Sequence, residues 1–143
     1  MYQKIIVVGY LGGDPEMRYM PDGTAVTNFS LATNRRWTAA NGEQKDETTW
    51  FRVSVWRQQA ETTNQYLSKG QKVLVEGRIR PDPQTGNPRL WTRQDGSVGA
   101  SFEITADTVR FLSGRDDGSG GGFNSGGDDY NGTPAQEEDD IPF

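Results

Sequence analysis

The sequence predicts an all-β domain: a partly open barrel of five strands with one short helix. Three observations predict it. β-Branched and aromatic residues gather in five short runs, turn signals separate these runs, and one segment between the third and fourth runs shows no alternation.

Five runs are expected to form the strands. Each is rich in β-branched or aromatic residues, and turn signals such as PDG, NG, TGNP and QDG lie between them. In chain order the runs are KIIVVGYLG (4–12), AVTNFSLAT (25–33), TTWFRVSVW (48–56), KVLVEGRIR (72–80) and SFEITADTVRFL (101–112).

The segment QQAETTNQYLSKG (58–70) is expected to form the helix. It shows no alternation, and Gly70 stands where a helix C-cap is favoured. Three strands, a helix and two further strands follow the order of an oligonucleotide/oligosaccharide-binding (OB) fold. A β-barrel of another kind with an incidental helix stays open as the alternative.

Residue usage excludes several kinds of site. The 143 residues include no Cys and no His, so the chain has no disulfide framework, no thiolate metal site and no histidine base or zinc ligand. No nucleophile–base pairing is visible, and we expect a protein that is not an enzyme and holds no metal or cofactor. The run Ile5–Val8 is too short for a signal-peptide core and no stretch could span a bilayer, which favours a soluble cytoplasmic protein without membrane association.

The charge is divided along the chain. Residues 1–113 carry fourteen Lys/Arg and twelve Asp/Glu, a net charge of +2, whereas residues 114–143 carry one Arg and eight acids, a net charge of −7. The acidic balance of the whole chain therefore belongs to its C-terminal segment. It does not argue against a nucleic-acid partner for the body.

The composition changes after Leu112. Gly, Ser, Asn and Asp dominate, and too little apolar surface is present to offset the ordering entropy. We therefore expect an OB domain at 1–112, a disordered Gly-rich linker at 113–136 and an acidic partner-docking tip at 137–143. An apolar end after four acids favours docking into a basic-rimmed apolar pocket over a merely solubilising tail. The docking residues are Asp139, Asp140, Ile141, Pro142 and Phe143.

The third run has an unusual outward face. Two-residue alternation puts Phe51, Val53 and Val55 on the core side. The opposite face carries Trp50, Arg52 and Trp56. A second core, such as a subunit interface or a packed helix, would explain a lone outward Trp.

Arginine lies near every tryptophan of the chain, which favours a ligand instead. Alternation from Phe29 and Leu31 would put Trp37 on the core side, so we expect a bend or bulge after Thr33. The candidate stacking residues are Trp37, Trp50, Trp56 and Trp91. The candidate phosphate contacts are Arg35, Arg36, Arg52, Lys72, Arg78, Arg80, Arg89 and Arg93.

This combination of side chains suits an unpaired nucleic acid strand. Bases stack on indole rings at roughly 1–3 kcal/mol per base. Guanidinium groups pair with the phosphates between the bases and also stack. Because stacking is indifferent to base identity, and because duplex bases are already stacked, we expect sequence-independent binding of single strands.

Two smaller motifs carry little weight. GYLGGD (9–14) resembles a glycine-rich phosphate loop, but no Lys-Ser/Thr follows and no βαβ unit surrounds it, so turn chemistry is expected. Asp14, Asp22, Asp46 and Asp82 could be metal ligands in principle. Dispersed acids in such turns are typically turn formers.

Three stretches resemble bacterial single-stranded DNA-binding proteins. They are VGYLGGDPEMRYMPDGTAVTNFSLAT (8–33), TTWFRVSVWRQQAE with YLSKGQKVLVEGRIR (48–80), and the terminal DDIPF. The resemblance covers nearly all of residues 1–112 and the last few residues. It implies an OB fold, usually a homotetramer, that wraps and protects single-stranded DNA in replication, recombination and repair. It also implies a place at the nucleoid and recruitment of replication and repair enzymes through the acidic terminus.

The resemblance carries the family's stacking aromatics onto Trp37, Trp50 and Trp56. The position of Trp56 is commonly Phe in the family. Trp91 follows PDPQTGNPRL, which is expected to lengthen the hairpin loop between the fourth and fifth strands, so it matches the family's fourth aromatic in role. Phe51 stands where the family often has His near a subunit interface.

Two other classes stay open. An RNA-binding OB module of cold-shock or translation-factor type also stacks bases on aromatics, and a scaffold could use its tryptophan face purely as an oligomer interface. Competition between oligo-dT and oligo-U tests the first alternative. Tryptophan quenching by oligo-dT tests the second.

Overall fold

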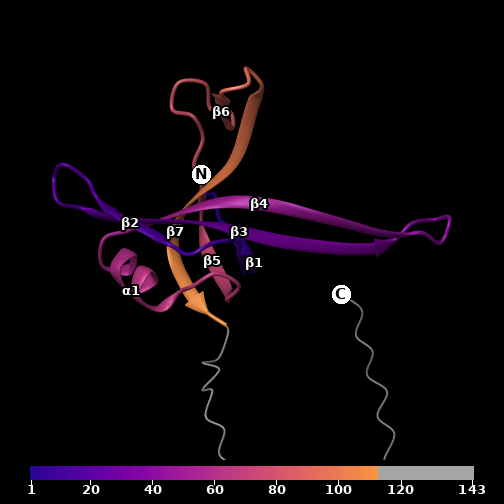
Figure 1. Cartoon of the computed structure of the whole chain (residues 1–143), viewed down its shortest axis with the longest axis horizontal. Coiled ribbons are helices and arrows are strands. Elements are labelled where there is room, and N and C mark those ends of the chain that lie inside the picture. The colour runs from indigo at the N-terminus through magenta and orange to yellow at the C-terminus, as the bar shows by residue number, and fades with distance from the viewer. Residues whose placement is uncertain (113–143) are drawn as a thin grey trace, which may run out of the picture.

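Five strands close into a barrel in the computed structural model, which describes residues 1–112 (Figure 1). They pair in the order β1-β5-β7-β4-β3, and β3 returns to β1 through Tyr10↔Ala32 and Leu11↔Leu31. The predicted five-stranded OB barrel is confirmed. Its strands are β1 (Ile5–Leu11), β3 (Ala25–Thr38), β4 (Gln44–Trp56), β5 (Lys72–Ile79) and β7 (Val98–Phe111).

Two further strands lie off the barrel, and the sequence did not predict them. β2 (Glu16–Tyr19) pairs with β3, and β6 (Arg89–Thr92) pairs with β7. Each has four residues, and neither buries a side chain fully. Without a buried face, such short strands lack the apolar alternation that identifies a strand in a sequence.

The barrel interior is filled by alternate residues of the five strands and by Leu67. Phe51 lies at the edge of this core, where its ring packs against that of Phe102 on β7 with centroids 6.0 Å apart. The fully packed residues are Val7, Leu11, Phe29, Leu31, Val53, Val55, Val73, Val75 and Ile104.

Helix α1 (Gln58–Tyr66) lies between β4 and β5, as predicted. It packs on β3, where the Thr27 hydroxyl donates to the carbonyl of Ala60 at 2.6 Å. Its expected C-cap is wrong, because the helix ends before Leu67, whose backbone is extended. Gly70 instead forms a turn with φ 86°, and its N–H donates to the Leu11 carbonyl at 2.9 Å.

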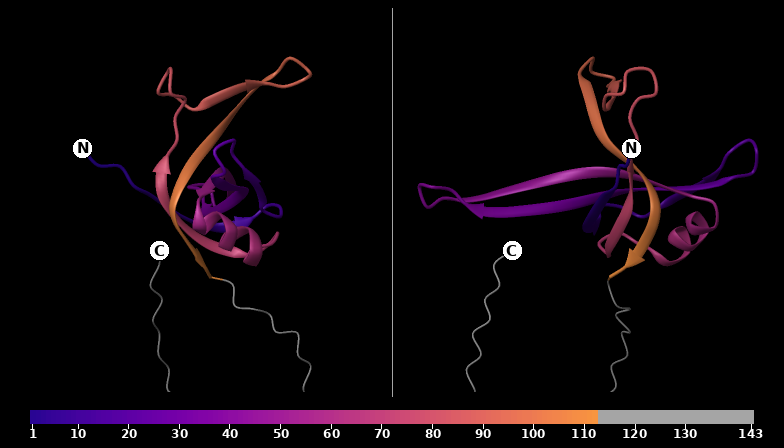
Figure 2. Two further views of the ribbon diagram at one scale, coloured as in Figure 1. Left: turned by 90° about the vertical axis from the view of Figure 1, so that its left-hand side faces the viewer. Right: turned by 180° about the vertical axis from the view of Figure 1, so that it is seen from behind.

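Two hairpins project from the barrel in different directions (Figures 1 and 2). One is the β3–β4 ribbon, which turns at Gly42, and the other is the β6–β7 hairpin, which turns at Gly96. Both glycines have φ 83°, a conformation that other residues rarely adopt. The ribbon keeps an unbroken register from Val26↔Trp56 to Thr38↔Gln44. Of the bend or bulge expected after Thr33, this register excludes the bulge.

No helix among residues 1–112 is long and apolar enough to cross a membrane. The expected linker at 113–136 and the docking tip at 137–143 lie outside the described residues.

Candidate nucleic-acid interface

The outward face of β4 is open at Trp50 and Arg52, as the alternation predicts, whereas Ser54 on the same face is buried. Trp50 is 53% exposed, whereas the inward Val53 and Val55 are 0% and 1% exposed. Trp56 is partly buried at the end of the strand. The strand thus divides into a core face and an accessible face that carries indole rings.

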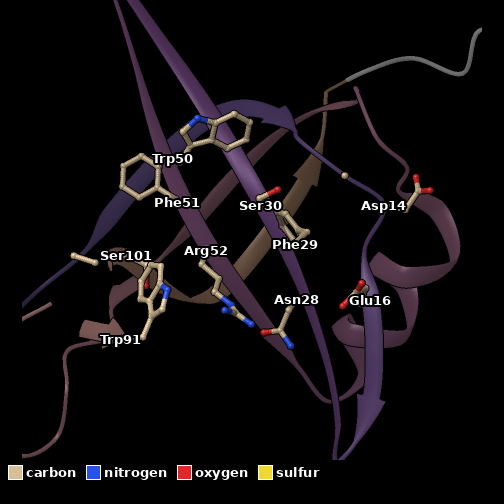
Figure 3. Close-up of a pocket in the computed structure, with 12 residues that line it drawn as sticks. Asp14, Glu16, Asn28, Phe29, Ser30, Trp50, Phe51, Arg52, Trp91 and Ser101 are labelled. Carbon is tan, nitrogen blue, oxygen red and sulfur yellow. The ribbon is translucent and has the colours of Figure 1, made fainter. Parts of the chain in front are cut away.

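A groove of about 460 Å³ lies between this face and the β6–β7 hairpin (Figure 3). Trp50, Trp91 and Arg52 all line it, and in that view the Arg52 side chain lies beside the Trp91 ring. The long loop before Trp91 therefore does not carry this ring away, because the hairpin brings it back against β4. We call this feature the tryptophan groove.

Four arginines from separate segments of the chain meet beside the groove, in a pocket of about 210 Å³. Trp91 and Arg52 line both the pocket and the groove, so the two are continuous. None of the four forms an ion pair within residues 1–112. With Glu103 as the only acid in its wall, the pocket has a formal charge of +3, which favours an anion. We call it the arginine pocket; its cations are Arg18, Arg52, Arg80 and Arg89.

Trp56 lines a separate cleft of about 720 Å³, together with Arg57 and Arg78. Two acids, Asp22 and Asp107, also line it, so its charge is balanced. The backbone N–H of Thr24 donates to Asp22 Oδ1 at 2.9 Å, and this bond holds the pKa of the Asp22 carboxyl below its usual value. We call this feature the Trp56 cleft.

Trp37 lies on the β3–β4 ribbon, beyond the barrel. It keeps the parity of the core residues of β3, but at this point there is no core beneath it, so the ring is exposed. The guanidinium of Arg35 lies over the ring, 4.9 Å from its centroid. Arg36 projects from the opposite face and pairs with Asp46 at 3.3 Å. The structure does not bring Trp37 to the tryptophan groove.

Two more of the expected phosphate contacts, Lys72 and Arg93, do not line the arginine pocket. Lys72 lies over the ring of Tyr10, 5.8 Å from its centroid. It is six residues along β5 from Arg78, about 20 Å at the usual strand rise. Arg93 lies over Trp91, 5.8 Å from the ring centroid, and donates to Ser97 Oγ at 3.3 Å.

Two basic residues were missed by the sequence analysis. Arg18 lies on β2, a strand that the sequence did not reveal, and so it had no predicted face. Arg57 follows Trp56, where alternation would point it inward. Its backbone leaves the strand conformation, with φ 63° and ψ −134°, and its side chain lines the Trp56 cleft. Its position next to Trp56 is the one feature of the sequence that could have indicated a place for Arg57 at the interface.

Of the four dispersed acids, Asp22 and Asp82 form turns, Asp46 forms an ion pair, and Asp14 accepts from the distant Lys69 N–H. Asp14 and Asp82 accept backbone N–H groups, as Asp22 does, and Asp46 pairs with Arg36. Within residues 1–112, no three His, Cys, Asp or Glu side chains are close enough together to hold a metal ion.

Known proteins resemble this chain in sequence and in structure. It is 42% identical over 118 residues to the single-stranded DNA-binding protein of Neisseria meningitidis serogroup A, a match that covers 82% of this chain and 64% of that protein. It is 36% identical over 135 residues to the single-stranded DNA-binding protein of Wolinella succinogenes, covering 94% and 79%. The solved Plasmodium falciparum SSB complex with ssDNA superposes with a TM-score of 0.64 at 29% identity, covering 79% of this chain and 97% of that one.

The model of the single-strand binding protein family matches residues 2–112. That span contains every strand of the barrel, both projecting hairpins and all four tryptophans. This chain belongs to the single-strand binding protein family.

Proposed function

We propose that this protein binds single-stranded DNA without sequence preference and protects it during replication, recombination and repair. One observation carries the proposal: Trp50, Trp91 and Arg52 line one groove, and the groove continues into the arginine pocket. Bases stacked on the two indoles would leave the intervening phosphates beside the guanidinium groups. The proposed role is binding without catalysis.

The names of similar proteins support the proposal. The Neisseria and Wolinella relatives are single-stranded DNA-binding proteins, and the Plasmodium protein was solved with ssDNA. A bacterial protein of this kind would act in the cytoplasm, at the nucleoid.

Titration with oligo-dT while tryptophan fluorescence is followed tests the function. Stacking on Trp50 and Trp91 is expected to quench the emission strongly, and a duplex of the same length is expected to bind far more weakly. If oligo-dT changed neither the tryptophan emission nor the sedimentation of the protein, the tryptophan face would instead be an oligomer interface. If oligo-U bound as well as oligo-dT, the protein would instead be an RNA-binding OB module.

We propose that the chain assembles as a homotetramer through the outward side of β1, among other surfaces. β1 pairs with β3 only at Tyr10 and Leu11, and β3 also lies against Gly9, so residues 5–8 present a free strand edge. Ile6, Val8 and Tyr10 are exposed beside this edge. A free edge with an apolar face favours pairing with another chain. Sedimentation equilibrium, with and without oligo-dT, measures the number of copies.

The acidic tip is proposed to recruit replication and repair proteins, with residues 113–136 as its linker. Deleting Asp139–Phe143 is expected to abolish partner recruitment. The deletion should leave binding of single-stranded DNA intact or slightly tighter, because a competing polyanion is removed. Pull-down of the partners and oligo-dT titration measure the two effects. A Phe143→Ala variant keeps all the acids, so full recruitment by it would contradict docking through the apolar end.

Arg57 is proposed as a further phosphate contact, in the Trp56 cleft. It is the only non-glycine residue within 1–112 that has a positive φ, so Arg57→Gly is expected to remove strain and to keep or raise stability by about 1 kcal/mol. The same change should weaken oligo-dT binding and reduce the slope of log K against log salt by about 0.7. Arg110→Ala, near Glu76 on the barrel wall, is the control. It should change neither the oligo-dT affinity nor the slope of log K against log salt. An unchanged slope in Arg57→Gly would show that the residue does not contact the strand.

A further inference from the structure

Two glycines lie under the two rings of the tryptophan groove. A Cβ on Gly12 would lie 2.4 Å from Cζ3 and 2.8 Å from Cη2 of Trp50. A Cβ on Gly99 would lie 2.6 Å from both Cε2 and Cζ2 of Trp91. Carbon atoms in ordinary contact stay about 3.5–4.0 Å apart. Each ring therefore occupies space that any side chain on its glycine would fill.

Backbone conformation does not explain either glycine. Neither Gly12 nor Gly99 has a positive φ. Gly13, the next residue after Gly12, has nothing within 4 Å of its Cβ position, so the crowding is specific to Gly12. The ring above each glycine is the feature of the structure that accounts for the missing side chain.

Both glycines are also fixed in place. The N–H of Gly12 donates to the Ser30 carbonyl on β3 at 3.0 Å. Gly99 lies on β7 directly opposite Trp91 in the β6–β7 ladder. Because neither backbone can withdraw without disturbing this bond or this strand pairing, an added methyl group would have to displace the ring. Ser30 Oγ, 2.9 Å from the Gly12 Cβ position, is the nearest atom there after the two ring carbons, and a hydroxyl can rotate away.

We propose that Gly12 and Gly99 are positioning residues, which hold the rings of Trp50 and Trp91 in the orientation that stacks bases. The proposal rests on the proposed binding of single-stranded DNA. An indole held against the backbone on one side offers its remaining surface to the groove. It also gives up less rotamer freedom when a base arrives, which favours binding.

Gly12→Ala is the first test, with Gly13→Ala as its matched control. Gly12→Ala is expected to weaken oligo-dT binding by about 5- to 20-fold, no more than Trp50→Ala does. Gly13 itself lines the groove, so Gly13→Ala is the control for the position of the ring and not for the affinity. The chain has four tryptophans, so its NMR spectrum has four indole N–H resonances. Gly12→Ala should shift the resonance that is missing from Trp50→Ala, and Gly13→Ala should not move it.

The double mutant separates positioning from general damage to the barrel. With Trp50 replaced by Ala, the space above Gly12 is empty, so Gly12→Ala should cause no further loss of binding. The corresponding pair is Gly99→Ala in a Trp91→Ala background. A Gly12→Ala variant that binds like wild type overturns the proposal, and so does an equal loss in the Trp50→Ala background. If the wild-type protein fails to bind oligo-dT, the proposed function itself is wrong.

Discussion

Replacing Trp91 by alanine is expected to weaken oligo-dT binding by about 1–3 kcal/mol, or roughly 5- to 150-fold, with little change in stability. Trp91 lies on a projecting hairpin and is 42% exposed, so its loss opens no cavity in the barrel. The sequence leaves its role open because a long loop precedes it. The structure puts its ring in the same groove as Trp50.

Leu90→Ala is the matched control for this prediction. Leu90 is the neighbour of Trp91 on β6, is more exposed than Trp91, and lines neither the tryptophan groove nor the arginine pocket. Leu90→Ala should leave the oligo-dT affinity unchanged. Because Trp50 and Trp91 would stack different bases, the free-energy losses of the single variants should add in the double variant. If Trp91→Ala bound oligo-dT with wild-type affinity, the β6–β7 hairpin would not be part of the DNA-binding surface.

The sequence predicts the features that burial imposes. Phe51, Val53 and Val55 alternate because they fill the barrel, and the same alternation correctly turns Trp50 outward. The barrel strands and the position of α1 follow from such patterns. In these parts of the fold, an apolar side chain can be buried only in the barrel interior.

The mistaken predictions share a different physical origin. Strict alternation requires a bend or bulge after Thr33 to keep Trp37 out of the core, but the β3–β4 ribbon continues past the end of the barrel, where neither face is buried. Alternation says nothing of solvent exposure once the core has ended. Gly70 likewise forms a turn and not a helix cap. The sequence does not distinguish the two, because both require the same positive φ.

The arginine pocket could not be predicted for a third reason. Its cations come from β2, β4, β6 and the segment after β5, and their convergence depends on how the hairpins leave the barrel. A basic residue in an exposed four-residue strand has no local signature. Arg18 is such a residue, whereas Arg52 was found because it lies between two outward tryptophans.

Gly77→Ala is expected to destabilise the barrel by about 3 kcal/mol. A Cβ on Gly77 would lie 2.2 Å from the carbonyl oxygen of Thr105 and 3.0 Å from Cα of Ala106, both backbone atoms of β7. The residue lies at the register shift between β5 and β7, where the two strands approach closely. Relief would require separating strands that the barrel needs to stay closed. A melting temperature lower by on the order of 10–20 °C is expected.

Gly77→Ala and Gly12→Ala should have opposite effects, although an added methyl group is crowded about equally at each. At Gly12 the obstacle is an indole ring that can turn into the open groove, so Gly12→Ala should lose affinity and keep most of its stability. At Gly77 the obstacle is backbone, so Gly77→Ala should lose stability first. Thermal melts of both variants beside Gly13→Ala measure the difference. A Gly77→Ala variant that melts within about 2 °C of wild type would mean that β5 and β7 can separate at the bulge without opening the barrel.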